Sequence, residues 1–383
     1  MLQLLNIKKM KKSILSLVTI SLLSSSLFAG DVRVGGFINV VAGINDMDNS
    51  QKDIISGYDD KINFQAHSLA GIQFNADVAN NMGAVVQLIA QKSDANDDIR
   101  MEWGYVSYDV NDEILILAGR VRPSLFLYSN YLDVGYAYTW ITPPSEVYYQ
   151  AQITNLDGLN ISYDLELEDS TISLNIYGGN SSGEKINPAD NTHLDFSYDN
   201  IYGTELSYTN DYMKIRAGYI NALATQNPVP PYPAEIVFDD SKAQFYGLGI
   251  SVDYEDILFA SEYTIRDMDE TVAPDVTSYY AMLGYKMGDF TTSYTYSVAD
   301  SDMEFSTVAD LSVAGMVNGA RASQLDDRTT NTLNVRYDLN SAAALKVEYS
   351  MCTKTNSSFN GTTTLTEKDE DINTLSVALN VVF

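Results

Sequence analysis

The chain has little of several residue types, and each shortage excludes a class of protein. Its 383 residues include one cysteine, Cys352, which excludes a disulfide framework and a cysteine-based zinc cluster. Only 23 basic residues stand against 51 acidic ones, and the net charge of −28 excludes a nucleic-acid binder because phosphate recognition depends on a basic face. No stretch after residue 30 approaches the roughly 20 apolar residues of a membrane-spanning helix, so a helical membrane protein is excluded as well.

The first 29 residues have the layout of a signal peptide. Four lysines near the start precede an apolar run that ends at Leu23, and small residues then lead to Ala29. The apolar run is too short for a transmembrane anchor. We therefore expect cleavage after Ala29 and export across the cytoplasmic membrane. The remaining domain, residues 30–383, has lost four lysines, so its net charge is −32.

Alternation with a period of two residues recurs along that domain. In residues 62–78 every second side chain from Phe64 onward is apolar or small, while Gln65, His67 and Gln73 lie on the opposite face. This pattern predicts a strand of about sixteen residues with one apolar and one polar face. The same alternation is present in residues 159–168, 213–219 and 345–351. The 27 tyrosines and 13 phenylalanines also favour strands.

The length of these strands favours a barrel in a membrane over a soluble sandwich. Strands of ten or more residues exceed the five or six that are usual in soluble sheets. They match the 9–11 residues that a tilted strand needs to cross a bilayer. In such a barrel the apolar face meets lipid and the polar face lines a lumen. The sequence therefore predicts an all-β fold, a transmembrane antiparallel β-barrel.

Counting the strands depends on where tight turns alternate with longer loops. Seven turns fit sixteen strands, with fourteen or eighteen as alternatives, and two further segments near 148–154 and 193–199 are then assigned to loops. The turns are expected at Val78–Met82, Val110–Asp112, Glu168–Ser170, Asn210–Asp211, Glu255–Asp256, Met287–Asp289 and Leu339–Ser341. The loops are expected at 43–61, 92–99, 122–155, 180–200, 222–242, 267–276, 300–328 and 354–371.

Two segments carry a resemblance to a known family. The chain ends on an alternating strand whose last residue is Phe383, and residues 114–122 form a strand that contains Gly119-Arg120 before a long loop at 122–155. In these features and in its strand and turn plan, the chain resembles the Gram-negative general porins. The resemblance implies a sixteen-stranded homotrimer in the outer membrane, a third loop folded into the lumen, and recognition of Phe383 by the barrel assembly machinery. The apolar body of loop 122–155 favours the inward fold, since it is too aromatic for a solvated external loop.

A lumen of sixteen strands is too wide to discriminate between solutes without a constriction. Carboxylates on an inward loop opposite basic wall residues would create a transverse field there. The loop lacks the Pro-Glu-Phe-Gly-Gly type of signature of enteric porins, so both of its acids remain candidates, and the alternative for each residue is a solvated charge at a strand end. The acidic candidates are Asp133 and Glu146, and the basic ones are Arg120, Arg122, Lys214 and Arg216, with Arg33, Arg100, Arg266 and Arg336 as further basic positions.

Other chemistry has weak support in the sequence. His67 and His193 have no ligand partner at metal spacing, and the acidic clusters at 94–98 and 300–304 lack calcium-loop spacing. We find no local support for a hydrolase triad and no phosphate-binding glycine-rich loop. No metal, cofactor or catalytic residue is therefore expected.

The leading functional expectation is passive diffusion of ions and small hydrophilic solutes across the outer membrane. A substrate-selective channel for sugars or anionic solutes is the alternative within transport. A barrel enzyme or an adhesin is the alternative from another class. The net negative charge predicts a weak preference for cations, which wall arginines could reverse locally.

Overall fold

The structure is a computed structural model that describes residues 32–47, 56–92, 97–151, 153–186, 193–227, 239–268, 273–303, 311–360 and 364–383. The expected signal peptide and its cleavage site lie outside these residues, so the division of the chain at residue 29 stays a prediction. Within the described part, no helix is both long and apolar enough to span a membrane.

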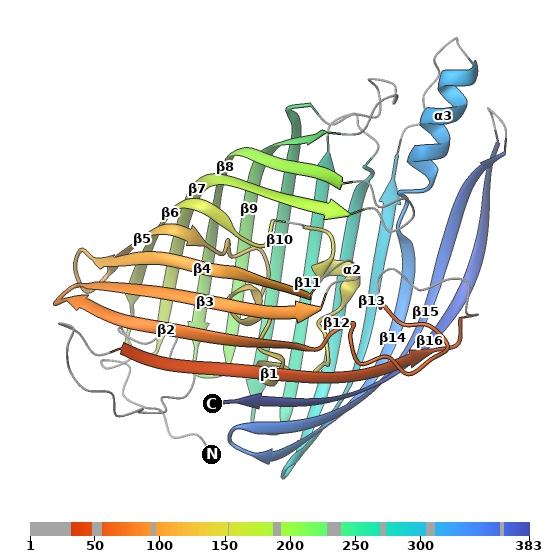
Figure 1. Cartoon of the computed structure of the whole chain (residues 1–383). Coiled ribbons are helices and arrows are strands. Elements are labelled where there is room, and N and C mark those ends of the chain that lie inside the picture. The colour runs from red at the N-terminus through yellow and green to blue at the C-terminus, as the bar shows by residue number, and fades with distance from the viewer. Residues whose placement is uncertain are drawn as a thin grey trace.

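Sixteen antiparallel strands close into one barrel, as expected from the turn pattern (Figure 1). Each strand pairs with its neighbours in sequence, and β1 closes on β16 through the register from Phe37 opposite Val382 to Asn45 opposite Thr374. The strands are β1 (Val32–Asn45), β2 (Leu69–Ala79), β3 (Met82–Lys92), β4 (Asp97–Asp109), β5 (Ile114–Val121), β6 (Leu156–Glu166), β7 (Ser170–Ile186), β8 (His193–Asn210), β9 (Met213–Asn227), β10 (Ser241–Tyr254), β11 (Ile257–Met268), β12 (Asp275–Met287), β13 (Phe290–Asp302), β14 (Asp327–Asn340), β15 (Ala343–Asn360) and β16 (Thr364–Val382).

The two faces of the wall separate as the period-two pattern predicts. On β13 the outward Tyr294 and Tyr296 are exposed, whereas the inward Thr295 and Ser297 are 1% and 2% exposed. Rings also contact one another along the outer surface, as Tyr212 with Tyr254 at the turn end of the strands. This arrangement fits an apolar outer band with aromatic side chains at its borders.

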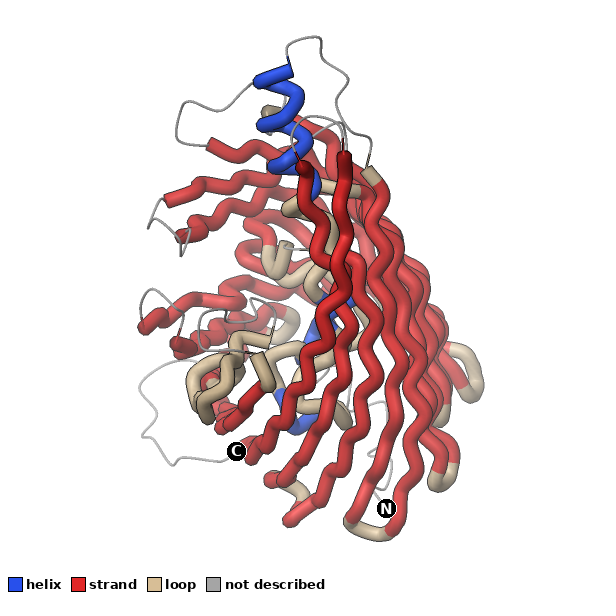
Figure 2. The backbone as a smooth tube through the Cα atoms, turned by 90° about the vertical axis from the view of Figure 1, so that its right-hand side faces the viewer, coloured by secondary structure: helices blue, strands red, loops and turns tan. Residues whose placement is uncertain are grey.

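All seven expected tight turns separate the strands that they were expected to separate, and Figure 2 shows several of them together at one end of the barrel. Several loops are shorter than expected. Residues 193–199 are the start of β8 and not a loop, because β7 and β8 remain paired out to Ile186 and His193 after a register shift near Gly179. The long hairpin of β15 and β16 likewise shortens the expected loop 354–371.

Two other expectations are wrong in detail. The strand expected over 62–78 begins only at Leu69, and before it Asn63 makes an isolated bridge to Gly43. His67 therefore precedes β2, where its Nε2 lies 2.9 Å from the Ser56 carbonyl oxygen. The expected loop 300–328 contains a helix, α3 (Leu311–Ala322), which packs against β15 beyond the loop ends of neighbouring strands (Figure 1).

Candidate functional site

The segment between β5 and β6 lies against the polar face of the wall. It contains two short 3-10 turns, η1 (Ser129–Tyr131) and η2 (Gly135–Ala137), and one helical turn, α2 (Ser145–Tyr148). Its aromatic residues form the main hydrophobic cluster with inward residues such as Phe245 and Tyr280. Its backbone is bound by polar side chains from β1, β9, β11 and β15, and its side chains Trp140 and Glu146 are bound by hydroxyls from β13 and β14. These contacts explain why Thr295, Ser297 and Thr330 on the wall are buried.

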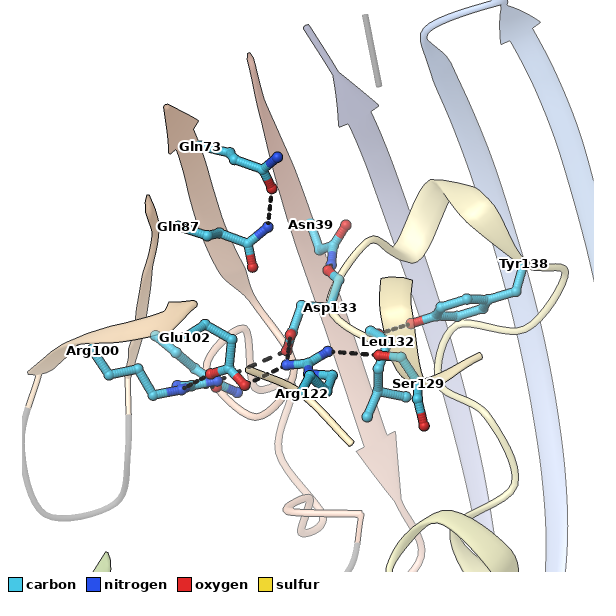
Figure 3. Close-up of polar contacts among 11 residues, drawn as sticks. Asn39, Gln73, Gln87, Arg100, Glu102, Arg122, Ser129, Leu132, Asp133 and Tyr138 are labelled. Atoms are coloured by element: carbon cyan, nitrogen blue, oxygen red, sulfur yellow. Dashed lines mark hydrogen bonds and ion pairs between the residues drawn. The ribbon is translucent and has the colours of Figure 1, made fainter. Parts of the chain in front are cut away.

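Arg122 joins the start of this loop to β4 (Figure 3). Its guanidinium donates to Glu102, to Asp133 at 2.5 Å and to the Ser129 carbonyl at 2.9 Å. Glu102 is the extra residue of an irregularity in the β3–β4 register, which turns its side chain toward Arg122. Burial opposes the charge of Arg122, but the carboxylates of Asp133 and Glu102 outweigh it and raise the pKa of this guanidinium. The charge of Arg122 is therefore neutralised by its carboxylate partners, and its hydrogen bonds fix the start of the loop.

Arg216 on β9 holds the next stretch of the loop. It is 1% exposed and donates at 2.6 Å to the carbonyl oxygens of both Ser124 and Leu125. Its charge faces Glu205 at 3.6 Å and Glu262 at 3.9 Å. Arg216 thus neutralises two wall carboxylates while it fixes two loop carbonyls.

Glu262 on β11 continues this network toward α2. It accepts from the Leu127 backbone N–H at 2.8 Å, from Tyr280 at 3.0 Å and from the Tyr148 hydroxyl. Burial and the nearby Glu262 carboxylate raise the pKa of Tyr148, so this phenol keeps its proton and donates it. The contact fixes α2 against the wall.

The far end of the loop is held by Lys346 on β15. Its ammonium donates to the carbonyl oxygens of Gly135, Tyr138 and Trp140 at 2.5, 2.7 and 2.5 Å. The neighbouring Glu348 accepts from the Ile141 N–H at 3.0 Å. Neither residue was among the sequence candidates, although both lie at the polar positions of the alternation in residues 345–351.

Glu146, an acidic candidate, lies in α2 and is 2% exposed. It accepts from Ser297 at 2.9 Å and from Thr330 at 2.6 Å, and the Nε of Arg328 lies 3.9 Å away. Asp133, the other acidic candidate, is bound to Arg122, and its backbone carbonyl accepts from Asn39 at 2.8 Å. Glu146 therefore attaches the loop to the wall, whereas the Asp133 carboxylate binds Arg122 within the loop and lies 3.8 Å from Arg100 of β4.

The basic candidates are placed differently from one another. The structure brings Arg122 and Arg216 to the loop, but not Arg120, which pairs in a bidentate manner with Asp157 at 2.8 Å. Leu115 and Leu117 on the same strand line a cavity of about 870 Å³. Arg120 is at an alternate position of this strand, so it lies on the other face of the wall. Lys214 lines the same cavity, and within the described residues its side chain makes no direct hydrogen bond or ion pair.

The further basic positions mostly have partners too. Arg33 pairs with Asp77 at 3.1 Å, Arg100 with Glu102 at 2.9 Å and Arg336 with Asp338 at 2.7 Å. Arg266 donates to backbone carbonyls of Gln150 and Pro274. Across the residues that the structure describes, no group of three or more His, Cys, Asp or Glu side chains is arranged to bind a metal ion.

Comparison with known proteins gives one family. A sequence model described as Gram-negative porin matches residues 15–357, while no curated protein sequence matches the chain. Among solved structures, OmpF of Salmonella typhi in complex with daunomycin is similar with a TM-score of 0.57 at 14% identity, covering 92% of this chain and 98% of that one. An anion-selective porin from Comamonas acidovorans gives 0.56 at 13%, covering 93% and 100%. A loop-deletion variant of OmpT from Vibrio cholerae gives 0.56 at 15%, also covering 93% and 100%. At these identities the structural likeness shows the fold alone.

Proposed function

Because the chain belongs to the Gram-negative porin family, we propose that it forms a water-filled channel for passive diffusion of ions and small hydrophilic solutes. Family and fold point to an outer-membrane channel without enzymatic activity. We further propose that a signal peptide of residues 1–29 directs its export, that the channel works without a cofactor, and that it prefers cations weakly.

The observation that carries the proposal is the attachment of loop 122–155 to the polar wall. Arg216 and Lys346 bind its backbone from β9 and β15, which are well separated around the barrel. A barrel of sixteen strands needs such a segment across its lumen to become selective. We therefore assign this loop to the lumen as the constriction.

The charges of the attached loop support weak cation preference. Arg122 and Arg216 are each balanced by two carboxylates, and the Lys346 ammonium is surrounded by loop carbonyl oxygens. Arg120, Arg122 and Arg216 therefore contribute little net field, whereas Lys214, without a direct partner among the described residues, adds a local positive charge. The negative charge of the domain, −32 without its first 29 residues, then raises the cation concentration at the mouths.

A salt gradient across a planar bilayer tests conduction and preference together. The purified protein is expected to give open single channels in KCl. In the salt gradient, its reversal potential should have the sign of the potassium equilibrium potential, as expected for a pore that prefers cations. Screening at high salt should reduce the preference, because charges at the mouths act over about 10 Å at 0.1 M. Absence of open-state conductance would remove the proposal, and a reversal potential of opposite sign would remove the cation preference alone.

Replacing Asp133 or Glu146 by alanine tests the constriction. Asp133→Ala leaves Arg122 with one carboxylate and is expected to change the reversal potential toward anions. Glu146→Ala removes the acceptor of two buried hydroxyls and is expected to loosen α2 and increase conductance. Asp157→Ala is the matched control, because it removes an acid paired with Arg120 outside this network. Unchanged conductance and selectivity in both test variants would mean that the loop is not the constriction.

Assembly completes the proposal. We propose a homotrimer, in keeping with the trimer form described for OmpT of Vibrio cholerae. We also propose that Phe383 is recognised by the barrel assembly machinery, in a chain whose outer surface meets outer-membrane lipid. In the folded barrel, Phe383 exchanges two backbone hydrogen bonds with Gly36, at 2.8 and 2.9 Å. A second candidate function, a solute-selective channel, is favoured by the cavity beside the loop.

A further inference from the structure

A cavity of about 870 Å³ lies between loop 122–155 and the wall formed by the first nine strands. This volume is within the range of about 300–1,000 Å³ that is usual for small-molecule sites. The loop contributes Phe126 and Leu127, and turn-end residues such as Asp109 and Asp164 line its other end. A solute that passes the loop would enter this space.

One side of the cavity is aromatic. Trp103 and Tyr105 from β4 line it with Phe126 of the loop, and the rings of Trp103 and Tyr105 have centroids 6.4 Å apart. Trp103 is 5% exposed, and its indole Nε1 has no hydrogen-bond partner in the described part of the chain. A buried donor without a partner is costly, but this atom has almost no accessible surface, so the aromatic side offers a ligand mainly the apolar surface of its rings.

Farther along the wall, strands β6 to β8 carry short hydroxyl and amide side chains. Asn160 and Ser162 on β6, Asn175 on β7 and Ser207 on β8 all line the cavity. Ser162 donates to Asn175 at 2.5 Å, and Asn175 donates to Glu205 at 2.6 Å. This wall can hydrogen-bond a polar backbone and has little apolar surface to offer.

Three charged side chains of the cavity have no direct partner among the described residues, although the carboxylates of Glu205 and Glu262 act electrostatically on Lys214. Lys214, Asp109 and Asp164 line it without a hydrogen bond or ion pair from their side chains anywhere in the described ranges. The other charged lining residues have partners, as Arg33 has Asp77 and Glu205 has Arg216. The free charges are therefore two negative and one positive.

The register separates these charges along the wall. Asp109 and Asp164 lie on β4 and β6, which flank β5. From Asp164 the paired positions run through Ser173 and Ser207 to Arg216, and Lys214 is the next inward residue on β9. Three strand spacings of about 4.8 Å and an offset of two residues along β9 place the backbones of Asp164 and Lys214 roughly 16 Å apart. The reach of these two side chains reduces the gap between their charges. Asp109 on β4 is five strands from β9 and lies farther from Lys214. An extended dipeptide spans about 7 Å, which suits such a gap.

We propose that this cavity is a binding subsite for small zwitterions with an apolar side chain, of the size of a dipeptide. The ammonium group lies toward Asp109 and Asp164, the carboxylate toward Lys214, and the apolar side chain against Trp103, Tyr105 and Phe126. The inference rests on the proposed channel function and adds a solute class to it.

Block of the KCl current by four defined peptides tests the proposal. The probes are glycyl-phenylalanine, its N-acetyl derivative without the ammonium, its amide without the carboxylate, and glycylglycine without the apolar side chain. Glycyl-phenylalanine is expected to halve the current at the lowest concentration. Each of the others should need a concentration at least about tenfold higher, because each loses one charged or apolar contact.

Variants assign each charge to its residue. Lys214→Gln should make glycyl-phenylalanine and its amide halve the current at the same concentration. The double variant Asp109→Asn, Asp164→Asn should do the same for glycyl-phenylalanine and its N-acetyl derivative. Lys286→Gln is the matched control, because Lys286 lies on β12 away from the cavity lining and pairs with Asp253. Each variant is compared only where its KCl conductance shows an open channel.

Equal potency of the four probes would overturn the subsite, as would Lys214→Gln behaving like Lys286→Gln. Normal KCl conductance without block by any probe would remove the subsite and leave the channel intact. Absence of KCl conductance in the unmodified protein would instead remove the proposed function, and the subsite with it.

Discussion

Replacing Arg216 by methionine is expected to destabilise the protein by about 3–5 kcal/mol, because it leaves buried charges without their partner. Arg216 faces both Glu205 and Glu262, which are 3% and 1% exposed. The same substitution removes the donors of the Ser124 and Leu125 carbonyls. Loss of stability and release of the loop should therefore occur together.

The two tryptophans of the chain make this effect measurable. Trp103 lies near Arg122, and Trp140 is 1% exposed and donates to Thr295 at 2.8 Å. A loosened loop is expected to shift their fluorescence to longer wavelength and to give noisier channels of higher conductance. Urea titration of the protein in detergent micelles gives the change in stability.

Arg33→Gln is the control for Arg216→Met. Arg33 also pairs with a carboxylate, but its side chain is 42% exposed and that of Asp77 is 59% exposed. Surface pairs of this kind contribute about 0–1 kcal/mol, so little change is expected. Equal stability losses in the two variants would contradict an anchoring role for Arg216.

A triple variant separates the two consequences of losing Arg216. Arg216→Met with Glu205→Gln and Glu262→Gln removes the stranded carboxylates, so part of the stability should return. The loop carbonyls still lack their donors, so the altered conductance should persist. Full recovery of conductance in the triple variant would mean that charge balance, and not attachment of the loop, determines the channel conductance.

The wall of this barrel could be predicted from the sequence because its information is local. Alternation and turn residues predicted the seven tight turns, which alternate with longer loops between the sixteen strands. The errors arise where the local pattern weakens. Residues 193–199 continue β8 because pairing to β7 holds them, and α3 forms within a segment that has no clear strand pattern.

The candidate site was partly predictable for the same reason. Parity on β9 indicated inward side chains at Lys214 and Arg216, and both line the interior. What they contact could not be predicted, since Arg216 binds loop carbonyls more than 90 positions earlier in the chain. Lys346 and Glu348 were visible as polar residues of an alternating strand, but only the folded loop shows that they hold it.

Replacing Gly119 by alanine is expected to cost at least about 3 kcal/mol, from backbone strain and overpacking combined. Gly119 has φ +133°, which side-chain-bearing residues rarely adopt. An added Cβ would lie 2.3 Å from the Gly104 carbonyl oxygen and 2.9 Å from the Tyr105 Cα. Both obstacles belong to β4, so relief requires that β4 and β5 move apart.

Two glycine controls separate strain from crowding in a urea titration of all three variants. Gly288 has φ +64° and open space around its would-be Cβ, so Gly288→Ala should cost about 1–2 kcal/mol. Gly183 has open space as well and no positive φ, so Gly183→Ala should stay within about 0.5 kcal/mol. The loss of stability in Gly119→Ala should be larger than in either control. Separation of β4 from β5 would also move Arg122 away from Glu102, so the channel conductance should change as well. A loss no larger than that of Gly288→Ala would mean that the close approach of the two backbones at Gly119 is not required by the fold.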